Sequence, residues 1–242
     1  MNIHSIETFG TQEGPGIRYV LFVQGCNYKC LYCHNPDTQC LDKNIEMNVG
    51  EIIIQVMKNV PFFGAKGGIT VSGGEPLLQA KELSELFMKL QKNGVNTCLD
   101  TNGSILTEQT KVLLNHTDLV LLDIKEADTD LHSTVSGVKS GSVPSIDFAK
   151  YLDTIGKPFW VRYVLVPGYT DDAESLEKLS KILKEFKSLE RIEILPYHTL
   201  GAHKYKELKM KYELESTESP TQENIESAKK ILEKSGKKVF VR

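Results

Sequence analysis

The feature that most constrains the fold is a repeated alternation of short apolar runs with amphipathic helical segments. Residues 17–24, 69–72, 96–100, 119–124, 159–166, 191–196 and 238–241 form the apolar, β-branched runs that we expect to be strands. Such an alternation predicts an α/β fold built on a parallel sheet. A doubly wound sheet and a complete or partial barrel fit it equally well, and periodicity alone does not choose between them.

Helix-terminating and helix-capping residues lie between these runs. One helix is expected to start at Asn48 with Glu51 and to stop at Pro61, and the next to end at Asn93 and Gly94. A third is expected at 176–186, with Asp171 and Glu174 as its capping residues, and a fourth to open at Pro220 with Glu223 and to end at Gly236. Leu83, Leu86, Phe87 and Leu90 recur at helical spacing in the second of these segments. The sequence therefore predicts helices between successive strands, as in βα repeats.

The composition is that of an ordinary globular chain. Of its 242 residues, 40% are hydrophobic and 25% are charged, which excludes disordered and collagen-like proteins. The net charge of −3 gives no basic surplus for binding nucleic acid. No apolar run approaches the roughly 18 residues of a membrane helix, and the first residues lack the pattern of a signal peptide. We expect one domain over 1–242 in the reducing cytoplasm, with neither nucleic acid nor membrane as partner.

Three of the five cysteines lie within eight residues, on the loop expected after the first strand. Cys26, Cys30 and Cys33 have the spacing C-x₃-C-x₂-C. Three thiolates this close can ligate three corners of one iron–sulfur cluster or metal ion. A structural zinc site needs a fourth ligand, for which Cys40 or His34 could serve, but no second C-x₂-C knuckle is present.

Other interpretations of the cysteines remain open at this point. Cys30 to His34 also match C-x-x-C-H, the haem attachment motif of exported proteins, and a simple ferredoxin would use four cysteines. Three unliganded thiols are a further alternative. The remaining interpretation is a [4Fe–4S] cluster with three cysteine ligands and one open iron, because an open position is typical of catalytic metal sites. We expect Cys40 and Cys98 to be structural, as small buried apolar side chains.

Glycine and polar residues follow the expected strands where each strand ends. They fall in segments 26–33, 73–76, 100–103, 123–125, 167–168 and 197–198. Because sites in α/β folds gather beyond the carboxyl ends of the strands, we expect these segments to line one site. Gly73 and Gly74 have no Cβ, so the backbone there can approach a ligand closely.

Two carboxylates, Asp100 and Asp123, are expected in this site. They repel each other unless a cation lies near them. Lys125, Arg162 and a bound monovalent metal ion are the candidate cations. Arg162 lies within the fifth strand, where a buried arginine must pair with a carboxylate such as Asp123 or with a ligand.

The cysteine spacing and the run Ser72-Gly73-Gly74-Glu75-Pro76 together resemble the radical S-adenosylmethionine (SAM) superfamily. More narrowly, the chain resembles the enzymes that activate glycyl radical enzymes. The stretches that carry this narrower resemblance are 10–18, 24–26, 32–35, 98–103, 122–125, 162–168 and 195–198. The likeness extends from about residue 3 to the C-terminus.

The resemblance implies a partial (β/α)₆ barrel of the TIM type, the radical SAM core. It also implies that Cys26, Cys30 and Cys33 hold a [4Fe–4S] cluster, with the amino and carboxylate groups of SAM on the open iron. Electron transfer then cleaves SAM to methionine and a 5′-deoxyadenosyl radical. In such enzymes the cofactors supply the chemistry, while the protein positions the reacting atoms and excludes water.

The same resemblance implies which residues contact SAM. They are Tyr32, His34, Gly73, Gly74, Asp100, Asp123, Ile124, Lys125, Arg162 and His198. The backbone of Gly73 and Gly74 is expected at the methionyl amino group, the backbone of the Tyr32 segment around the adenine, and His198 near the adenosyl part. We favour SAM over a carboxylate as the partner of Arg162.

The implied substrate is a protein. The radical removes a Cα hydrogen from a glycine of a glycyl radical enzyme, with pyruvate formate-lyase expected because the chain has no inserted ferredoxin-like domain. A reduced flavodoxin or ferredoxin is the implied electron donor. The alternatives are another glycyl radical enzyme as partner, a radical SAM enzyme that acts on a small molecule, and a cluster-bearing or zinc-bearing binding module without catalysis.

Overall fold

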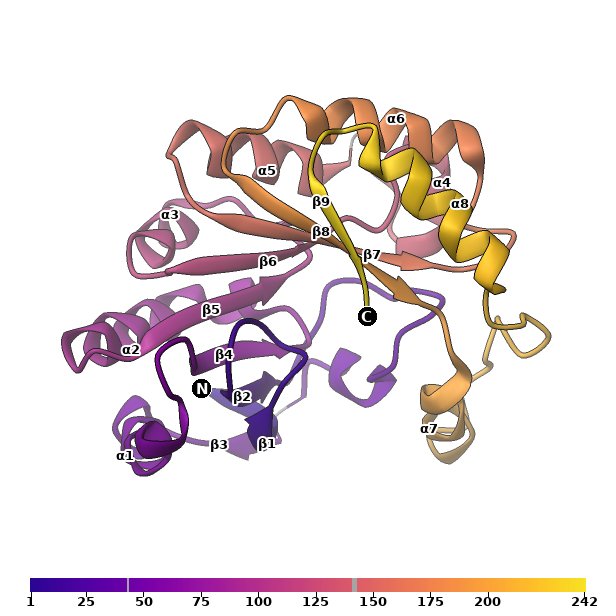
Figure 1. Cartoon of the computed structure of the whole chain (residues 1–242). Helices are drawn as coiled ribbons and strands as arrows, with labels where there is room; N and C mark the ends of the chain where they lie inside the picture. Colours follow the sequence, from indigo (N-terminus) through magenta and orange to yellow (C-terminus); the bar gives the residue numbers. More distant parts are fainter. Residues whose placement is uncertain (43, 141–142) are drawn as a thin grey trace. The chain divides into compact units, whose positions relative to one another are not determined.

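The computed structural model describes residues 1–42, 44–140 and 143–242, which form two compact α/β units (Figure 1). Unit 1 consists of residues 1–27 and 38–121, and unit 2 of residues 28–37 and 122–242. Each unit therefore contains two separate stretches of the chain. The expectation of one domain over 1–242 stays a prediction.

Unit 1 contains a five-stranded arrangement in the order β3-β1-β2-β4-β5. Its strands are β1 (Asn2–Gly10), β2 (Arg18–Val23), β3 (Ile45–Glu46), β4 (Gly68–Gly73) and β5 (Asn96–Thr101). β2, β4 and β5 run parallel, with Leu21, Val71 and Leu99 in one register row. β1 is antiparallel to β2 and to β3. Neither β1 nor β3 was predicted, because their residues form no continuous apolar run of the kind that buried parallel strands show.

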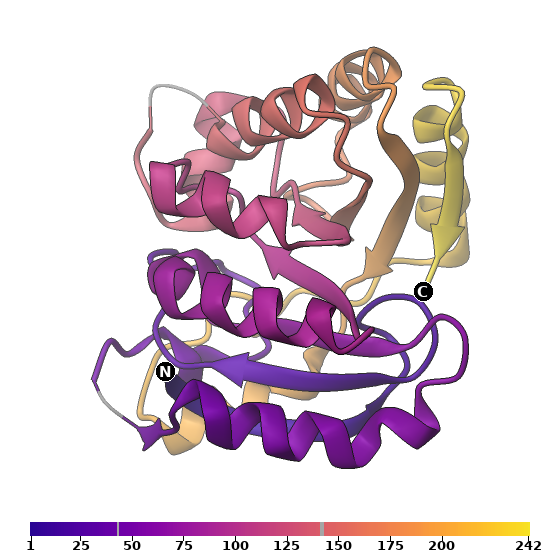
Figure 2. The same cartoon turned by 90° about the vertical axis from the view of Figure 1, so that its left-hand side faces the viewer.

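Helices of unit 1 pack on these strands. They are α1 (Val49–Asn59), α2 (Ala80–Lys92) and α3 (Glu108–Asn115), and Figure 2 shows α1 and α2 side by side along the strands. The predicted capping of α1 is confirmed, since Asn48 and Glu51 form a capping box. The helix ends at Asn59, and Pro61 lies in a short 3₁₀ turn.

Unit 2 contains three parallel strands in the order β7-β8-β9, namely β7 (Phe159–Leu165), β8 (Leu189–Pro196) and β9 (Lys238–Val241). Its helices are α4 (Thr129–Ser136), α5 (Pro144–Thr154), α6 (Ala173–Lys184), α7 (Ala202–Glu207) and α8 (Gln222–Glu233). α6 and α8 lie together beside β8 and β9 (Figure 1). β6 (Leu119–Asp123) carries the chain from unit 1 into unit 2.

Two predicted helix starts in unit 2 are wrong by one residue. Asp172, not Asp171, caps α6, and the Asp171 carboxylate instead accepts a hydrogen bond from the backbone of Gly168. Thr221, not Pro220, caps α8 and forms a capping box with Asn224 rather than with Glu223. Neighbouring polar residues offer similar capping groups, and only the backbone conformation decides which of them reaches the free N–H groups.

All seven predicted strands are present, each within two residues of the expected bounds. Their apolar runs are explained by burial, since Tyr19, Val20 and Leu21 of β2 are almost fully enclosed, as are Val120 and Leu121 of β6. Strands covered on both faces require such runs. Within the described ranges, no helix is long and apolar enough to cross a membrane.

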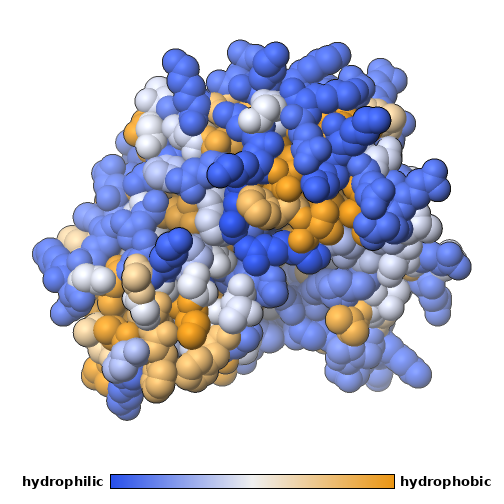
Figure 3. Space-filling model, viewed as in Figure 1, coloured by the Kyte–Doolittle hydropathy of each residue, from blue (hydrophilic) through white to orange (hydrophobic). Residues whose placement is uncertain are grey.

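Exposed apolar side chains gather over α1 and its surroundings in unit 1 (Figure 3). Phe9 of β1 and Phe62 after α1 are each about half exposed, and their rings meet edge to face with centroids 5.2 Å apart. Phe9 and Phe62 lie near the strand ends opposite Gly73 and Thr101, because β1 runs antiparallel to β2 and Phe62 precedes β4. This apolar area is therefore at the other end of unit 1 from the predicted site residues.

Candidate metal and cofactor site

The three cysteines lie on the loop that follows β2, where the chain passes from unit 1 to unit 2. Cys26 belongs to unit 1, and Cys30 and Cys33 belong to unit 2. All three cysteine side chains are half-buried, and thiols are soft donors of the kind that iron–sulfur clusters use. Across 1–42, 44–140 and 143–242, no group of three or more His, Cys, Asp or Glu side chains is arranged to hold a metal ion. The ligand set therefore stays a prediction.

The backbone on both sides of Cys30 is held by the end of α4. Lys29 N donates to Ser136 O at 2.9 Å, and Leu31 N donates to Val135 O at 3.0 Å. The last carbonyls of a helix have no partner within the helix, so these two are available to the loop. The short helix after β6 thus fixes the course of the cysteine loop in unit 2.

The segment after Cys33 is held by residues that follow β8. The Tyr205 hydroxyl donates to Cys33 O at 3.0 Å. The rings of His34 and His198 lie 4.1 Å apart, and His34 Nε2 lies 3.2 Å from His198 O, at hydrogen-bonding distance. Burial, and next the neighbouring His198, lowers the pKa of His34. Two residues predicted at SAM, His34 and His198, are therefore brought together.

Tyr32 lies between Cys30 and Cys33 and points into an apolar cluster. Its ring is almost fully buried against Val135, Val166 and Tyr197, among others. Its hydroxyl has no hydrogen-bond partner among the described residues, and burial raises the pKa of Tyr32 well above its ordinary value. Buried polar atoms almost always have a partner, so the unpaired hydroxyl fits a polar ligand beside this segment.

The two predicted glycines lie close to the backbone of the segment that follows β2. Gly73 has φ +100°, and a Cβ there would lie 2.7 Å from Val23 N. A Cβ on Gly74 would lie 2.0 Å from Gly25 O. Only glycine allows β4 to end this close to the chain that leads into the cysteine loop.

Glu75, in the same turn, is a buried carboxylate for which the sequence indicated no separate role. One oxygen accepts from Leu77 N at 2.9 Å and from the Thr101 hydroxyl at 2.6 Å, and the other accepts from Asn102 N at 2.8 Å. Burial raises the pKa of Glu75 to about 7. Glu75 thus ties the glycine turn after β4 to the turn after β5.

Each predicted aspartate has its own partner. Asp100, in β5, accepts a hydrogen bond from the Ser72 hydroxyl at 2.7 Å. Asp123 ends β6 and forms an ion pair with Lys125 at 2.5 Å. Burial lowers the pKa of Lys125, but the stronger combined effect of Asp123, Tyr32 and Cys30 raises it, so this amine is charged. Lys125 is therefore the counter-ion of Asp123.

Arg162 pairs with a carboxylate that the sequence analysis did not single out. Its Nε lies 3.2 Å from Glu193 of β8, and Glu193 also pairs with Arg191 at 2.5 Å and with Arg242 at 2.9 Å. The position of Glu193 within the apolar run of β8 could have indicated an ion pair, because a buried charge needs a partner of opposite charge. Ile124 N donates to Arg162 O, and the assignment of Ile124 and Arg162 to SAM stays a prediction.

The two remaining cysteines differ from each other. Cys98 is fully buried in β5, as predicted. Cys40 is exposed, so the expectation of a buried side chain is wrong, and its thiol instead donates to the Asp42 carboxylate at 3.1 Å. Cys40 lies directly after the 3₁₀ turn at Pro36–Gln39.

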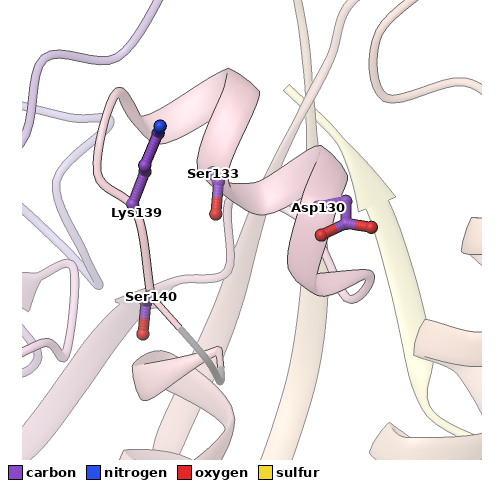
Figure 4. Close-up of a pocket in the computed structure, with 4 residues that line it drawn as sticks. All are labelled: Asp130, Ser133, Lys139 and Ser140. Atoms are coloured by element: carbon purple, nitrogen blue, oxygen red, sulfur yellow. The ribbon is translucent and has the colours of Figure 1, made fainter.

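A surface hollow lies beside α4. Asp130, Ser133, Lys139 and Ser140 line it (Figure 4). None of the residues predicted to bind the cluster or SAM is among them. The hollow is therefore separate from the predicted cofactor site.

Comparison with known proteins places the chain in a family. Residues 20–180 match the Radical SAM superfamily. Over 245 aligned residues the chain is 45% identical to "Pyruvate formate-lyase-activating enzyme" of Staphylococcus aureus strain USA300, covering 98% of this chain and 96% of the relative. The protein of that name from strain NCTC 8325 / PS 47 shows the same identity and coverage.

Solved structures share the fold. A domain of pyruvate-formate lyase-activating enzyme from Bacteroides vulgatus matches with a TM-score of 0.60 and 22% identity, over 73% of this chain and 99% of that one. Streptococcus suis SuiB bound to its precursor peptide SuiA matches with a TM-score of 0.69 and 18% identity, over 98% of this chain and 50% of that one. The predicted α/β radical SAM core is thereby confirmed. The chain belongs to the radical SAM superfamily and, within it, to the family of pyruvate formate-lyase-activating enzymes.

Proposed function

We propose that this chain is a radical SAM activase that removes a Cα hydrogen from one glycine of pyruvate formate-lyase. The observation that carries the proposal is the 45% identity to a relative of that name along nearly the whole of both chains. A reduced [4Fe–4S] cluster and SAM, held by this chain, would supply the radical chemistry that removes the glycine hydrogen.

The residues of this chain hold and orient those cofactors. Cys26, Cys30 and Cys33 are the proposed cluster ligands, and the α4 carbonyls hold the backbone of the second ligand. The charged Lys125 beside Asp123 suits the carboxylate end of SAM. The unpaired Tyr32 hydroxyl and the His198 ring suit its polar adenosyl part.

The finer parts of the proposal concern partners and ions. A reduced flavodoxin or ferredoxin is the proposed electron donor, and the cytoplasm the proposed location. A monovalent cation near Asp100 and Asp123 is also part of the proposal. If a cation binds there, the rate of glycyl radical formation should differ between a buffer whose only monovalent cation is sodium and one whose only monovalent cation is potassium, at the same ionic strength.

The first test is anaerobic reconstitution with iron and sulfide, followed by reduction and electron paramagnetic resonance. We expect a reduced [4Fe–4S] signal that changes when SAM is added, and then a carbon-centred radical on added pyruvate formate-lyase. Cys30→Ala is the matched variant and is expected to lose both the cluster and SAM cleavage.

Other outcomes separate the alternatives. A signal that responds to SAM without a radical on the partner would contradict the proposed substrate while retaining the superfamily chemistry. Retained zinc with no cluster would contradict the interpretation of the cysteines. Full SAM cleavage by Cys30→Ala would show that Cys30 is not a ligand.

A further inference from the structure

The end of α4 makes close contact with the cysteine loop at one glycine. Gly137 follows the last helical residue with φ +70°, the left-handed conformation that ends many helices. A Cβ built on Gly137 would lie 2.7 Å from Lys29 O and 3.1 Å from Lys29 Cβ. Real Cβ atoms do not approach backbone this closely, so a side chain at residue 137 requires either Lys29 or the end of α4 to move.

Displacement of Lys29 would act directly on Cys30. The hydrogen bonds from Lys29 to Ser136 and from Leu31 to Val135 enclose Cys30 between two fixed points. Because Cys30 lies between these two anchors, a shift of Lys29 would strain the backbone at Cys30. The contact at Gly137 therefore constrains the backbone that carries this thiol.

The start of α4 is fixed as well, so the helix can act as a rigid support. Asp128 caps it by accepting hydrogen bonds from Asp130 N and Leu131 N. Just before it, the fully buried Glu126 accepts from Ala127 N at 2.6 Å and from the Tyr163 hydroxyl at 3.0 Å. A side chain at residue 137 is therefore expected to displace the cysteine loop rather than the anchored helix.

We propose that Gly137 is a positioning residue for Cys30, and that its missing side chain lets the end of α4 hold this ligand where the cluster needs it. The inference rests on the proposed function in one respect, that Cys30 is a cluster ligand. Groups outside the ligand set that orient a ligand typically change metal affinity by about 10-fold to 100-fold when they are altered. Gly137 acts through Lys29, whose backbone leads into Cys30.

The test compares Gly137→Ala with Gly156→Ala in the full reconstituted chain. Gly156 follows α5 with φ +64°, and no atom of the described residues lies within 4 Å of a Cβ built on it. Both substitutions strain a left-handed residue, but only the one at Gly137 pushes on the cysteine loop. We expect Gly137→Ala to release iron to a chelator about tenfold faster than the unchanged chain. It should also alter the paramagnetic resonance signal of the reduced cluster, whereas Gly156→Ala should match the unchanged chain in both measurements.

Asparagine variants show whether the effect of Gly137→Ala comes from the contact with Lys29 or from backbone strain that destabilises the whole fold. Asparagine tolerates the left-handed conformation, so Gly137→Asn and Gly156→Asn repeat the comparison with less backbone strain. Equal iron release by the Gly137 and Gly156 variants would overturn the inference while leaving the proposed function intact. Absence of a [4Fe–4S] signal in the unchanged chain would instead contradict the proposed function.

Discussion

Glu75 is enclosed by protein and accepts three hydrogen bonds, all from N–H or O–H donors in two turns of unit 1. A glutamine there would direct its own N–H₂ group at one of those donors. Leaving a buried donor unpaired costs about 1–3 kcal/mol. We therefore expect Glu75→Gln to lower the free energy of unfolding of the iron-free chain by this amount, as measured by urea denaturation.

The cost of Glu75→Gln should depend on pH. The pKa of Glu75 rises from 4.5 to about 7 on folding, so its contribution to stability is full below about pH 4.5 and falls as the pH rises through 7. Relative to Glu75→Gln, the unchanged chain should therefore lose about 2.5 kcal/mol of stability between pH 5 and pH 8, which cancels or reverses the initial difference of about 1–3 kcal/mol. Glu85→Gln, on the exposed face of α2, is the control and should show no such trend. A difference that is constant with pH would contradict the raised pKa.

His198→Ala tests a single residue of the proposed SAM site. The ring packs on His34 at 4.1 Å, so its loss should leave the cysteines in place while removing one wall of the adenosyl site. We expect SAM to bind about tenfold more weakly, equivalent to about 1.4 kcal/mol, with unchanged iron content. Calorimetric titration of the reconstituted chain measures this change. His203→Ala, an exposed residue of α7, is the control, and unchanged affinity in His198→Ala would give His198 a purely structural role.

Among the helices, the start of α8 can be tested by comparing substitutions of two adjacent residues, one inside its capping box and one outside it. Thr221 and Asn224 exchange hydrogen bonds at 2.9 Å and 3.2 Å, whereas Pro220 lies outside the box. We expect Thr221→Ala to lower the free energy of unfolding by about 1 kcal/mol. Pro220→Ala should change it by less than about 0.5 kcal/mol, as is usual for surface residues. Equal effects in thermal or urea unfolding would place the helix start at Pro220.

The strands that could be predicted were the parallel ones. β2 and β7 are buried on both faces, so their sequences are apolar at nearly every residue. β1 alternates imperfectly and carries Glu7 and Thr8 among exposed residues, and β3 has only two residues. Their pairing depends on a neighbour that is distant in sequence, which a local pattern does not contain.

In the candidate site, too, the features that a local sequence pattern contains could be predicted, and those that depend on residues distant in sequence could not. The spacing of Cys26, Cys30 and Cys33 is local and is visible in the sequence. The three hydrogen bonds of Glu75 and the arginines around Glu193 depend on strand register, which the sequence alone does not fix. The support that Gly137 gives to Lys29 likewise joins segments about a hundred residues apart.

At the scale of the whole molecule, the hydrogen bond from Tyr205 to Cys33 joins residues 172 positions apart in the chain. Tyr205→Phe removes only the hydroxyl, so we expect a loss of about 1 kcal/mol in the free energy of unfolding. Iron release to a chelator should also be faster, because the segment after the third cysteine loses one anchor. The control is Tyr169→Phe, since the Tyr169 hydroxyl makes no hydrogen bond within the described part of the chain. Identical iron release by both variants would show that this bond does not support the loop.

The Tyr205 contact also bears on how the protein is made. A ribosome adds about 5–20 residues per second, so roughly 10 to 30 s separate the synthesis of Cys33 from that of Tyr205. During that interval the nascent chain carries its three clustered cysteines without the hydrogen bond that later holds the Cys33 carbonyl. The cysteine loop is therefore expected to reach its final support only after residue 205 has been added to the chain.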